Sequence, residues 1–269
     1  PFSFLPCRLA PLAVRQKERA GEEIGVKVTK LHLPATETTD GLLQQIRRLN
    51  EDPTVHGIIV QMPVPDHMNS SAILEAIDYT KDVDGFHVRN AGELAQRNGK
   101  PRFVPCTAVG VMTLLEHNGI DVRGKRAAVI GRSDIVGMPV FQLLTKAGAT
   151  VTLCHTQTTN LVECTREADV LVVAAGRPEM IRKEHVKPGS VVVDVGIHTI
   201  PGTKKLCGDV KFDEVSEVAS AVSPVPGGVG PLTVAMLLQN TVRAAKAAEE
   251  ANQKRMTFIP LQLELPVPS

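Results

Sequence analysis

The turn after the apolar run Lys125–Ile130 has the residue types that bind a phosphate group. Residues 131–139 read GRSDIVGMP, so a glycine stands at each end of a strand-to-helix turn. Glycine lets backbone N–H groups approach a ligand closely, and the N-terminus of a helix attracts anions. The stretch therefore predicts a dinucleotide phosphate site, although Ser133 takes the second glycine position of the common GxGxxG pattern. An ordinary βα turn is the alternative interpretation.

The segment after the next strand-like run indicates which dinucleotide would bind. Residues 153–158 read LCHTQT and contain no carboxylate. Folds that bind NAD usually place Asp or Glu there to hold the ribose hydroxyl, whereas Arg132 and the threonine hydroxyls could hold a 2′-phosphate. This composition favours NADP over NAD. The plain interpretation of His155 is a partly buried side chain with a satisfied hydrogen bond.

Three further segments combine polar groups with turn residues. Gln61 ends an apolar run in VQMPVP (60–65), Asp82 and Asp84 lie in KDVDG (81–85), and residues 223–231 read SPVPGGVGP. A loop this rich in glycine and proline is rigid, and its backbone can approach a ligand. Each segment also has a structural interpretation, as a solvated strand end, a turn cap and a tight turn, respectively.

Apolar runs and helix-like stretches alternate around these segments. The runs are Gly57–Val60, Lys125–Ile130, Ala149–Leu153, Val170–Ala174 and Ser190–Asp194. Continuous rather than alternating apolar runs predict strands buried on both faces of a parallel sheet. The intervening helical stretches, Met138–Lys146 and Asn160–Ala168, predict an α/β fold with helices on both faces.

A separate α/β unit is predicted before Cys106. It comprises a helix over Gln16–Ile24 that Gly25 ends, a strand over Val26–Leu33, and a helix over Thr39–Asn50 capped by Thr39 or Asp40. At the other end, a long helix over Leu232–Lys254 precedes a proline-containing, linker-like tail, Met256–Ser269. Residues 1–14 are expected to be a truncated or irregular start.

Composition excludes several classes of protein. The 269 residues are 43% hydrophobic and 22% charged, which is typical of a soluble globular protein of one large or two modest domains. The net charge of +1 and the absence of Trp give no sign of nucleic-acid binding, and no apolar run approaches the ~18 residues of a membrane helix. The five cysteines form no CxxC pair, so we expect no metal site and reduced thiols of an intracellular protein.

Together these segments resemble the methylenetetrahydrofolate dehydrogenase/methenyltetrahydrofolate cyclohydrolase family. The matching stretches run in the family's order from about Val14 to Ala247: VRQKERAGEEIG, HGIIVQMPVP, KDVDGFH, PCTAVGV, GRSDIVGMPV, ATVTLCHT, ADVLVVAAGRP, VVVDVGI, GDVKF and SPVPGGVGPLTVAMLLQNT. The resemblance implies a folate-binding domain at 14–106 and a Rossmann-like NADP-binding domain at 107–223. A substrate loop with a helix returning to the first domain follows at 224–254, and a tail at 255–269. The site would lie in a cleft between the two domains.

The resemblance also implies roles for individual residues. Lys17 matches the catalytic lysine that helps activate water in the cyclohydrolase step, and Gln61 the glutamine that bonds this lysine and tunes its proton affinity. Asp84 matches the carboxylate that grips the pterin ring. The remaining implied substrate contacts are Val60, Met62, Pro226, Gly227, Gly228, Val229 and Gly230.

On the cofactor side, Gly131, Arg132 and Ser133 match the NADP phosphate turn. Thr156 keeps a hydroxyl where the NADP branch usually has Ser, and Ile197 matches a backbone contact near the nicotinamide. The short form ATVT after LLTKAGA places the chain near the NADP-using branch. The implied activity is NADP-dependent oxidation of 5,10-methylenetetrahydrofolate and hydrolysis to 10-formyltetrahydrofolate, in one-carbon metabolism and purine biosynthesis, by a homodimer.

One departure opens a second hypothesis. Ala13 occupies the position of a family tyrosine that packs on the folate, and the upstream residues match nothing in the family. The chain could therefore be a catalytically weakened domain with a structural or dimerisation role. A third hypothesis, another Rossmann-type dehydrogenase, does not explain VQMPVP, KDVDG and PVPGGVGP together. Residues 259–269 resemble the linker before a formate–tetrahydrofolate ligase domain, and the expected compartment is cytoplasmic, with mitochondrial as the alternative.

Overall fold

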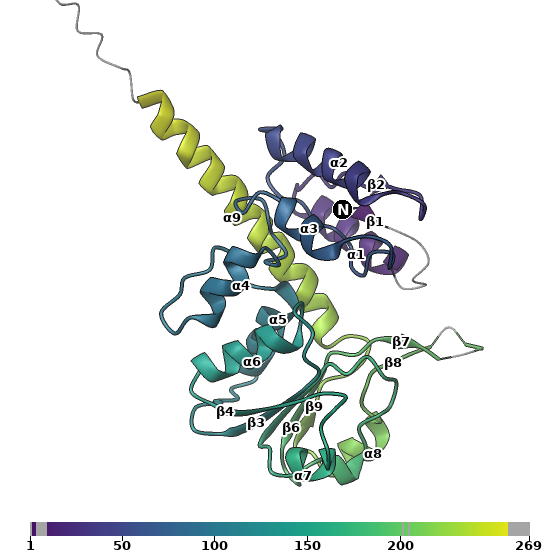
Figure 1. Ribbon diagram of the computed structural model, residues 1–269. Helices are drawn as coiled ribbons and strands as arrows, with labels where there is room; N and C mark the ends of the chain where they lie inside the picture. The colour runs from purple at the N-terminus through teal and green to yellow at the C-terminus, as the bar shows by residue number, and fades with distance from the viewer. Residues whose placement is uncertain (1, 4–9, 201, 204, 258–269) are drawn as a thin grey trace, which may run out of the picture.

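In the computed structural model, a parallel five-stranded sheet forms one half of the molecule and a helical unit the other (Figure 1). The structure describes residues 2–3, 10–200, 202–203 and 205–257. The strands of the sheet, in spatial order, are β4 (Thr150–Cys154), β3 (Arg126–Ile130), β5 (Val170–Val173), β6 (Val191–Asp194) and β9 (Ala221–Val222). All neighbouring pairs are parallel, so the strands' carboxyl ends meet at one edge.

Successive residues of the central strands enter two separate cores. Ala127 and Val129 pack with α5 (Cys106–His117) and α6 (Gly137–Lys146) on one face. Ala128 and Ile130 enter a second cluster, with side chains of α7 (Leu161–Thr165) and α8 (Phe212–Ser216), on the other face. The prediction of a doubly covered parallel sheet is confirmed.

Strand β4 is the exception to the predicted burial. The run Ala149–Leu153 was expected to be buried on both faces, but Thr150 and Thr152 are exposed. The reason is position: β4 lies at the edge of the sheet and, among the described residues, pairs with β3 alone.

The helical unit contains most elements before α5. They are β1 (Phe2–Ser3), α1 (Ala10–Glu23), β2 (Leu31–His32), α2 (Thr39–Glu51) and α3 (Ser70–Ala76), whereas α4 (Val88–Ala95) lies beside α6. Its core is formed by Leu42 and Ile46 of α2 and Ile73 of α3, packed with Ile58 and Val60. The remaining elements of the sheet half are η1 (Lys183–His185) and the hairpin β7 (His198–Thr199) and β8 (Leu206–Cys207).

The first predicted helix ends as expected but begins earlier. Gly25 has a φ of 77°, and the Val26 N–H donates to the Gly21 carbonyl at 2.8 Å, which is the Schellman pattern of a glycine stop. The helix begins at Ala10 rather than Gln16, so part of the predicted irregular start is regular. Residues 1 and 4–9 lie outside the described part of the chain.

The second predicted helix is capped one residue before the expected positions. The side chain of Thr38, not of Thr39 or Asp40, accepts the Gly41 N–H at 3.1 Å. Threonine at this position has extended backbone and supplies an oxygen for an unpaired N–H of the first turn. The sequence therefore predicted the right kind of N-cap residue but placed it one residue too late.

Two predicted strands of this unit are shorter than their apolar runs. Of Val26–Leu33, only Leu31 and His32 pair, in parallel with Phe2 and Ser3. Gly57–Val60 makes an isolated bridge, Ile58 with Asp82, and belongs to no named strand. β-propensity favours an extended backbone, but a strand also needs a neighbouring strand, which these segments mostly lack among the described residues.

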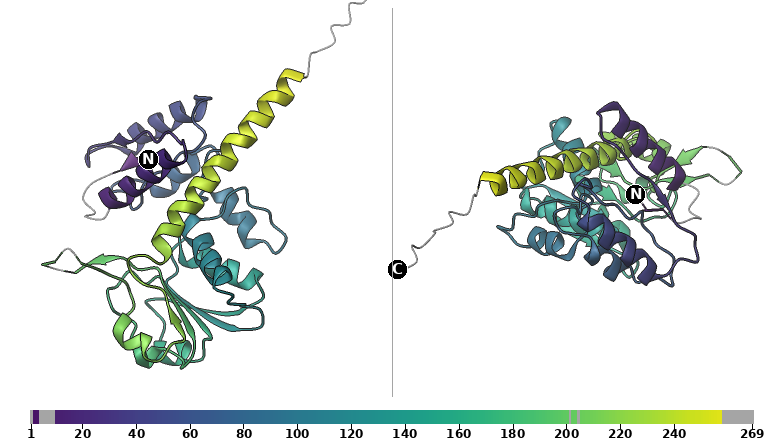
Figure 2. Two further views of the ribbon diagram at one scale, coloured as in Figure 1. Left: turned by 180° about the vertical axis from the view of Figure 1, so that it is seen from behind. Right: turned by 90° about the horizontal axis from the view of Figure 1, so that it is seen from above.

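The last helix, α9 (Val229–Thr257), joins the two halves. It packs along α5 and contacts α1, and both further views show it running past the helical unit (Figure 2). Its Leu237 and Ala244 are buried with Val83 and Phe103. The helix exceeds the predicted Leu232–Lys254 at both ends, and α7 is shorter than the predicted Asn160–Ala168. Residues 258–269, including the proposed linker motif, lie outside the described residues.

Two features are absent from the described residues. No helix there is both long enough and apolar enough to cross a bilayer. No cluster of three or more His, Cys, Asp or Glu in that part of the chain could hold a metal ion. Four cysteines found there, Cys106, Cys154, Cys164 and Cys207, are free thiols.

Burial predicts that two valines of the sheet contribute differently to the free energy of unfolding. Val172 of β5 is fully buried, whereas Val151 of the edge strand β4 is partly buried. We expect Val172→Ala to lower the free energy of unfolding by about 2–3 kcal/mol and Val151→Ala by about 1 kcal/mol. Urea denaturation of both variants measures this, and equal losses would contradict the assigned core.

Candidate active site

Lys17 and Gln61 meet although they are 44 residues apart. Lys17 lies on α1, and its Nζ donates to the Gln61 Oε1 at 3.2 Å in a partly buried position. The Gln61 Nε2 donates to the Met62 carbonyl at 3.3 Å, which orients the amide so that its oxygen faces the lysine. The pair holds an amine at a fixed place beside a cavity.

The residues of KDVDG divide into structural and candidate functional groups. Lys81 Nζ donates to the carbonyls of Leu49, Asn50 and Asp52 at 2.7–3.0 Å, so it caps the C-terminus of α2. Asp82 is buried and accepts the N–H groups of Phe86 and His87 and the Asn90 amide. Burial raises the pKa of Asp82 to about 6. Its interpretation as a turn cap is therefore confirmed.

Asp84, two residues further on, is close enough to Lys17 for their charges to interact. Burial raises the pKa of Asp84, while the charge of Lys17 and a hydrogen bond to Cys106 oppose that shift. The structure thus brings together the three side chains that the resemblance assigned to catalysis. An amine, an amide and a carboxylate in one place can bind a polar ring and move a proton at a bound water.

Two residues that the sequence analysis missed hold the backbone at Asp84. The Val83 carbonyl accepts from the Cys106 thiol at 3.3 Å and from Asn240 Nδ2 at 2.9 Å. Burial raises the pKa of Cys106, which keeps the thiol protonated as a donor. Asn240 is a buried amide on α9, and a polar residue within the apolar stretch of that helix was the only signal for it.

The predicted substrate contacts differ in accessibility. Val60 is 2% exposed and belongs to the apolar core of the helical unit, and Met62 packs against the same core. In the predicted loop 223–231, Val229 and Gly230 already form the first turn of α9. The loop itself is therefore shorter, and it contains Pro226, Gly227 with a φ of 107°, and Gly228, whose N–H donates to the Pro224 carbonyl.

The predicted phosphate turn joins the carboxyl end of β3 to α6. The Ser133 carbonyl accepts from Met138, and its hydroxyl accepts from Gly137 at 3.4 Å. A Cβ at Gly137 would collide with the Gly131 carbonyl, so only glycine allows the helix to begin so close to the strand end. The N-terminus of α6 consequently lies beside the turn.

Arg132 extends from this turn to the segment after β4. Its Nη2 donates to the Gln157 Oε1 at 3.4 Å, next to the exposed Thr156. His155 Nδ1 accepts the Gln157 N–H at 3.2 Å, which agrees with the interpretation of a satisfied, partly buried histidine. A cation and a hydroxyl thus share the surface where a 2′-phosphate would lie, and no carboxylate accompanies them in residues 153–158.

Ile197 lies beyond the carboxyl end of β6 and is 45% exposed. The adjacent carboxylate of Asp194 is buried, and burial raises its pKa to about 6. Asp194 ends an apolar strand, and a charged residue at the end of a buried run is the signal that would have revealed it. Asp209 follows a glycine after the short, partly buried β8 and has no such signal.

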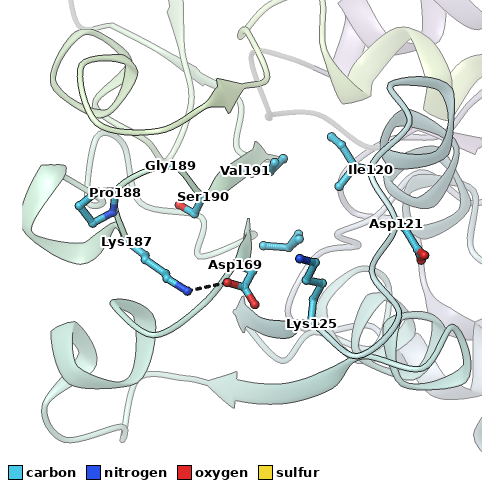
Figure 3. Close-up of a pocket in the computed structure, with 10 residues that line it drawn as sticks. Ile120, Asp121, Lys125, Asp169, Lys187, Pro188, Gly189, Ser190 and Val191 are labelled. Atoms are coloured by element: carbon cyan, nitrogen blue, oxygen red, sulfur yellow. Dashed lines mark hydrogen bonds and ion pairs between the residues drawn. The ribbon is translucent and has the colours of Figure 1, made fainter.

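Two cavities differ in their relation to these residues. A cavity of about 1080 Å³ lies between the helical unit and α9, and Lys17, Ile58, Val83 and Leu237 line it. A second, of about 340 Å³, is shown in Figure 3 and lies at the amino ends of β3, β5 and β6, opposite the phosphate turn. Its charged side chains, Lys125, Lys187, Asp121 and Asp169, balance one another. Lys187 is paired with Asp169 at 2.6 Å, so only the first cavity belongs with the candidate site.

Comparison with known proteins identifies similarity across both halves. The family model for the tetrahydrofolate dehydrogenase/cyclohydrolase catalytic domain matches residues 12–84, and that for the NAD(P)-binding domain matches residues 105–249. Bifunctional protein FolD 2 of Geobacter metallireducens is 52% identical over 89% of this chain and 83% of its own length.

Two further relatives extend this result. Cytoplasmic C-1-tetrahydrofolate synthase of Schizosaccharomyces pombe is 50% identical over 95% of this chain, but the chain spans only 28% of that protein. The crystal structure of Trypanosoma brucei methylenetetrahydrofolate dehydrogenase-cyclohydrolase, complexed with NADP cofactor and inhibitor, has a TM-score of 0.88 and 39% identity. The similarity covers 92% of this chain and 86% of that one.

The raised pKa of Asp82 predicts a pH dependence of stability. Unfolded, the group ionises near 3.8, whereas the folded protein retains the proton to about 6. The folded state therefore loses up to about 3 kcal/mol of this group's contribution as the pH rises from about 4 to 6. Asp82→Asn does not titrate, so the stability advantage of the wild type should shrink across this window and then stay constant. Urea denaturation from pH 4.5 to 7.5 measures it, and an advantage that grows with pH would refute the assignment.

Gly137 and Gly92 provide a matched pair of helical glycines. A Cβ at Gly137 meets the backbone of Gly131, whereas a Cβ at Gly92 in α4 meets nothing within 4 Å. We expect Gly137→Ala to lower the free energy of unfolding by about 1–3 kcal/mol and Gly92→Ala to raise it by up to about 1 kcal/mol. Thermal denaturation distinguishes the two, and a neutral Gly137→Ala would contradict the close packing of the turn.

Proposed function

Because this chain belongs to the tetrahydrofolate dehydrogenase/cyclohydrolase family, we propose that it oxidises 5,10-methylenetetrahydrofolate with NADP and hydrolyses the product to 10-formyltetrahydrofolate. The observation that carries the proposal is the meeting of Lys17, Gln61 and Asp84 at one site. These side chains come from α1 and two separate loops, and core packing alone does not require them to meet.

The dehydrogenase step needs positioning more than acid–base chemistry. NADP, when bound, would supply the acceptor for a hydride from the methylene carbon, and the lone pair of the folate nitrogen would assist the departure of that hydride. The residues available to hold the cofactor are Gly131 and Ser133 in the phosphate turn, Arg132 and Thr156 at the 2′-phosphate, and Ile197 near the nicotinamide. Their fit to NADP rests on the glycine-only approach of α6 to β3 and on the guanidinium beside Thr156.

The cyclohydrolase step requires a proton to leave the attacking water. Water adds to the methenyl carbon, and one of its two protons passes to solvent through the Lys17 amine. The bond from that carbon to N5 then breaks as N5 takes up the remaining hydroxyl proton, which leaves the formyl group on N10. Gln61 holds the Lys17 Nζ in place through its Oε1. Asp84 accepts hydrogen bonds from the pterin ring and fixes it against the amine.

The domain limits, the compartment, a following domain and the oligomeric state are further proposals. We infer a folate-binding domain over 14–106 and a cofactor domain over 107–223; the two family models, which match 12–84 and 105–249, support a boundary near residue 106. The relatives include cytoplasmic and mitochondrial C-1-tetrahydrofolate synthases, of which this chain spans 28% and 27%, so either compartment fits. We propose that a ligase domain follows in the natural protein and that the chain forms a homodimer, which light scattering tests.

A paired assay with Lys17→Ala tests the proposed function. We expect hydrolysis of methenyltetrahydrofolate to fall about 100-fold or more, because the proton-transfer group is lost, while NADP-dependent oxidation stays within about fivefold. Lys30→Ala, which removes an exposed lysine, is the control and should change neither rate. Both reactions are followed by the absorbance of the methenyl compound.

The same assay decides the alternative of a catalytically weakened domain. Nothing in the comparisons favours that alternative, and the Lys17–Gln61 pair is intact. Ala13 lies on α1, but its side chain is outside the described part of the structure. A wild-type protein that is folded and binds NADP but catalyses neither reaction would establish the alternative and refute the proposal.

A further inference from the structure

A buried carboxylate at the carboxyl edge of the sheet joins two loops that border the cofactor side. Asp209, which follows β8, has no exposed surface. Its Oδ2 accepts the N–H groups of Ala175 and Gly176 at 2.6 and 2.9 Å, and its Oδ1 lies 2.7 Å from His198 Nε2. An ionised carboxylate only accepts, so His198 donates through Nε2. One side chain therefore fixes the loop after β5 and the start of β7.

A second carboxylate holds the first in place. Asp194 Oδ1 accepts the N–H groups of Gly196 and Asp209 at 2.9 and 3.0 Å, and Oδ2 accepts that of Val210 at 2.9 Å. The Asp194 N–H donates to the Ser223 hydroxyl at 2.8 Å, where the loop leading to Pro226 begins. The two aspartates thus connect the segments that follow β5, β6, β8 and β9.

Close packing leaves this network little freedom. A Cβ at Gly196 would collide with the Asp209 carboxylate, and a Cβ at Gly208 with that of Asp194. Between them, Ile197 is 45% exposed, with Gly196 bonded to Asp194 on one side and His198 to Asp209 on the other. The backbone on both sides of this exposed apolar residue is therefore fixed by the two carboxylates.

The strand order places this network away from the phosphate turn. Arg132 and Thr156 follow β3 and β4, at one side of the sheet, whereas Asp194 ends β6 and Asp209 follows β8. A dinucleotide bound along the carboxyl edge with its 2′-phosphate at Arg132 extends over β5 toward β6. In that orientation its nicotinamide end would lie near Ile197 and the Ser223–Gly228 loop.

We propose that His198 and Asp209 are positioning residues for the nicotinamide end of the cofactor. They act through the backbone of Ile197 and of Ala175–Gly176 rather than by touching the adenosine end. The inference rests on the proposed function for the identity of the cofactor. It implies that the network serves oxidation and not hydrolysis, since hydrolysis at Lys17 needs no nicotinamide.

The test compares two ligands that share the adenosine 2′-phosphate half. NADPH has a nicotinamide and 2′,5′-ADP has none. For His198→Ala we expect the Kd of NADPH, measured by calorimetry, to rise about tenfold, and that of 2′,5′-ADP to stay within twofold. His198→Gln keeps a donor for Asp209 and should restore most of the affinity. Arg132→Ala should weaken both ligands, and His117→Ala, at the exposed end of α5, neither.

Kinetics of the same variants separate this inference from the proposed function. His198→Ala should lower kcat/KM for NADP about tenfold and leave cofactor-free hydrolysis of methenyltetrahydrofolate unchanged. Equal weakening of NADPH and 2′,5′-ADP, or no weakening of either, would overturn the positioning role. A wild type without either activity would refute the proposed function, while the ligand comparison would still decide the role of His198. Asp209→Asn, which removes one acceptor oxygen, should repeat the pattern if it folds.

Discussion

Buried backbone N–H groups in turns and beyond the strand ends need hydrogen-bond acceptors. Buried aspartates supply these acceptors in the loops on which the site depends. A strand end or a tight turn removes the ladder partner of an N–H without returning it to water. Asp82, Asp194 and Asp209 each accept from at least two backbone N–H groups and are at most 3% exposed. Burial makes their charge costly, as the raised pKa values of Asp82 and Asp194 show, so the loops are well defined only while all these hydrogen bonds are made.

Local pattern predicted those parts of the fold whose partners are regular and close by. The apolar runs of β3, β5 and β6 are buried on both faces, and α6 begins beside the glycine turn as expected. The predictions were less accurate where an element lacks neighbours: Val26–Leu33 shortens to β2, and β4 exposes its threonines at the sheet edge. An apolar run reports the preference of its own residues, whereas pairing and burial depend on segments far away in the sequence.

In the candidate site, too, the residues with a recognisable motif were predicted and those that depend on distant partners were not. The resemblance selected Lys17, Gln61 and Asp84, and the turn at Gly131 was visible from residue types alone. Neither the resemblance nor the residue types revealed Asn240, which donates to a carbonyl 157 residues away, or the contact of His198 with Asp209. These residues have no motif of their own, because any donor at the right place would satisfy the acceptor. Val60 shows the reverse case, since a residue within a matching motif belongs to the apolar core.

The angle of helix α9 determines the position of Asn240. It begins where the Ser223–Gly228 loop ends, and one helical advance per residue puts Asn240 about 16 Å along its axis from Val229. A rotation of about 5° at the base of this rod would displace Asn240 by about 1.4 Å, at 1.5 Å of rise per residue. That is half the length of its 2.9 Å hydrogen bond to Val83, the neighbour of Asp84. A change of that size in the angle of α9 would therefore break the hydrogen bond that holds the backbone beside Asp84.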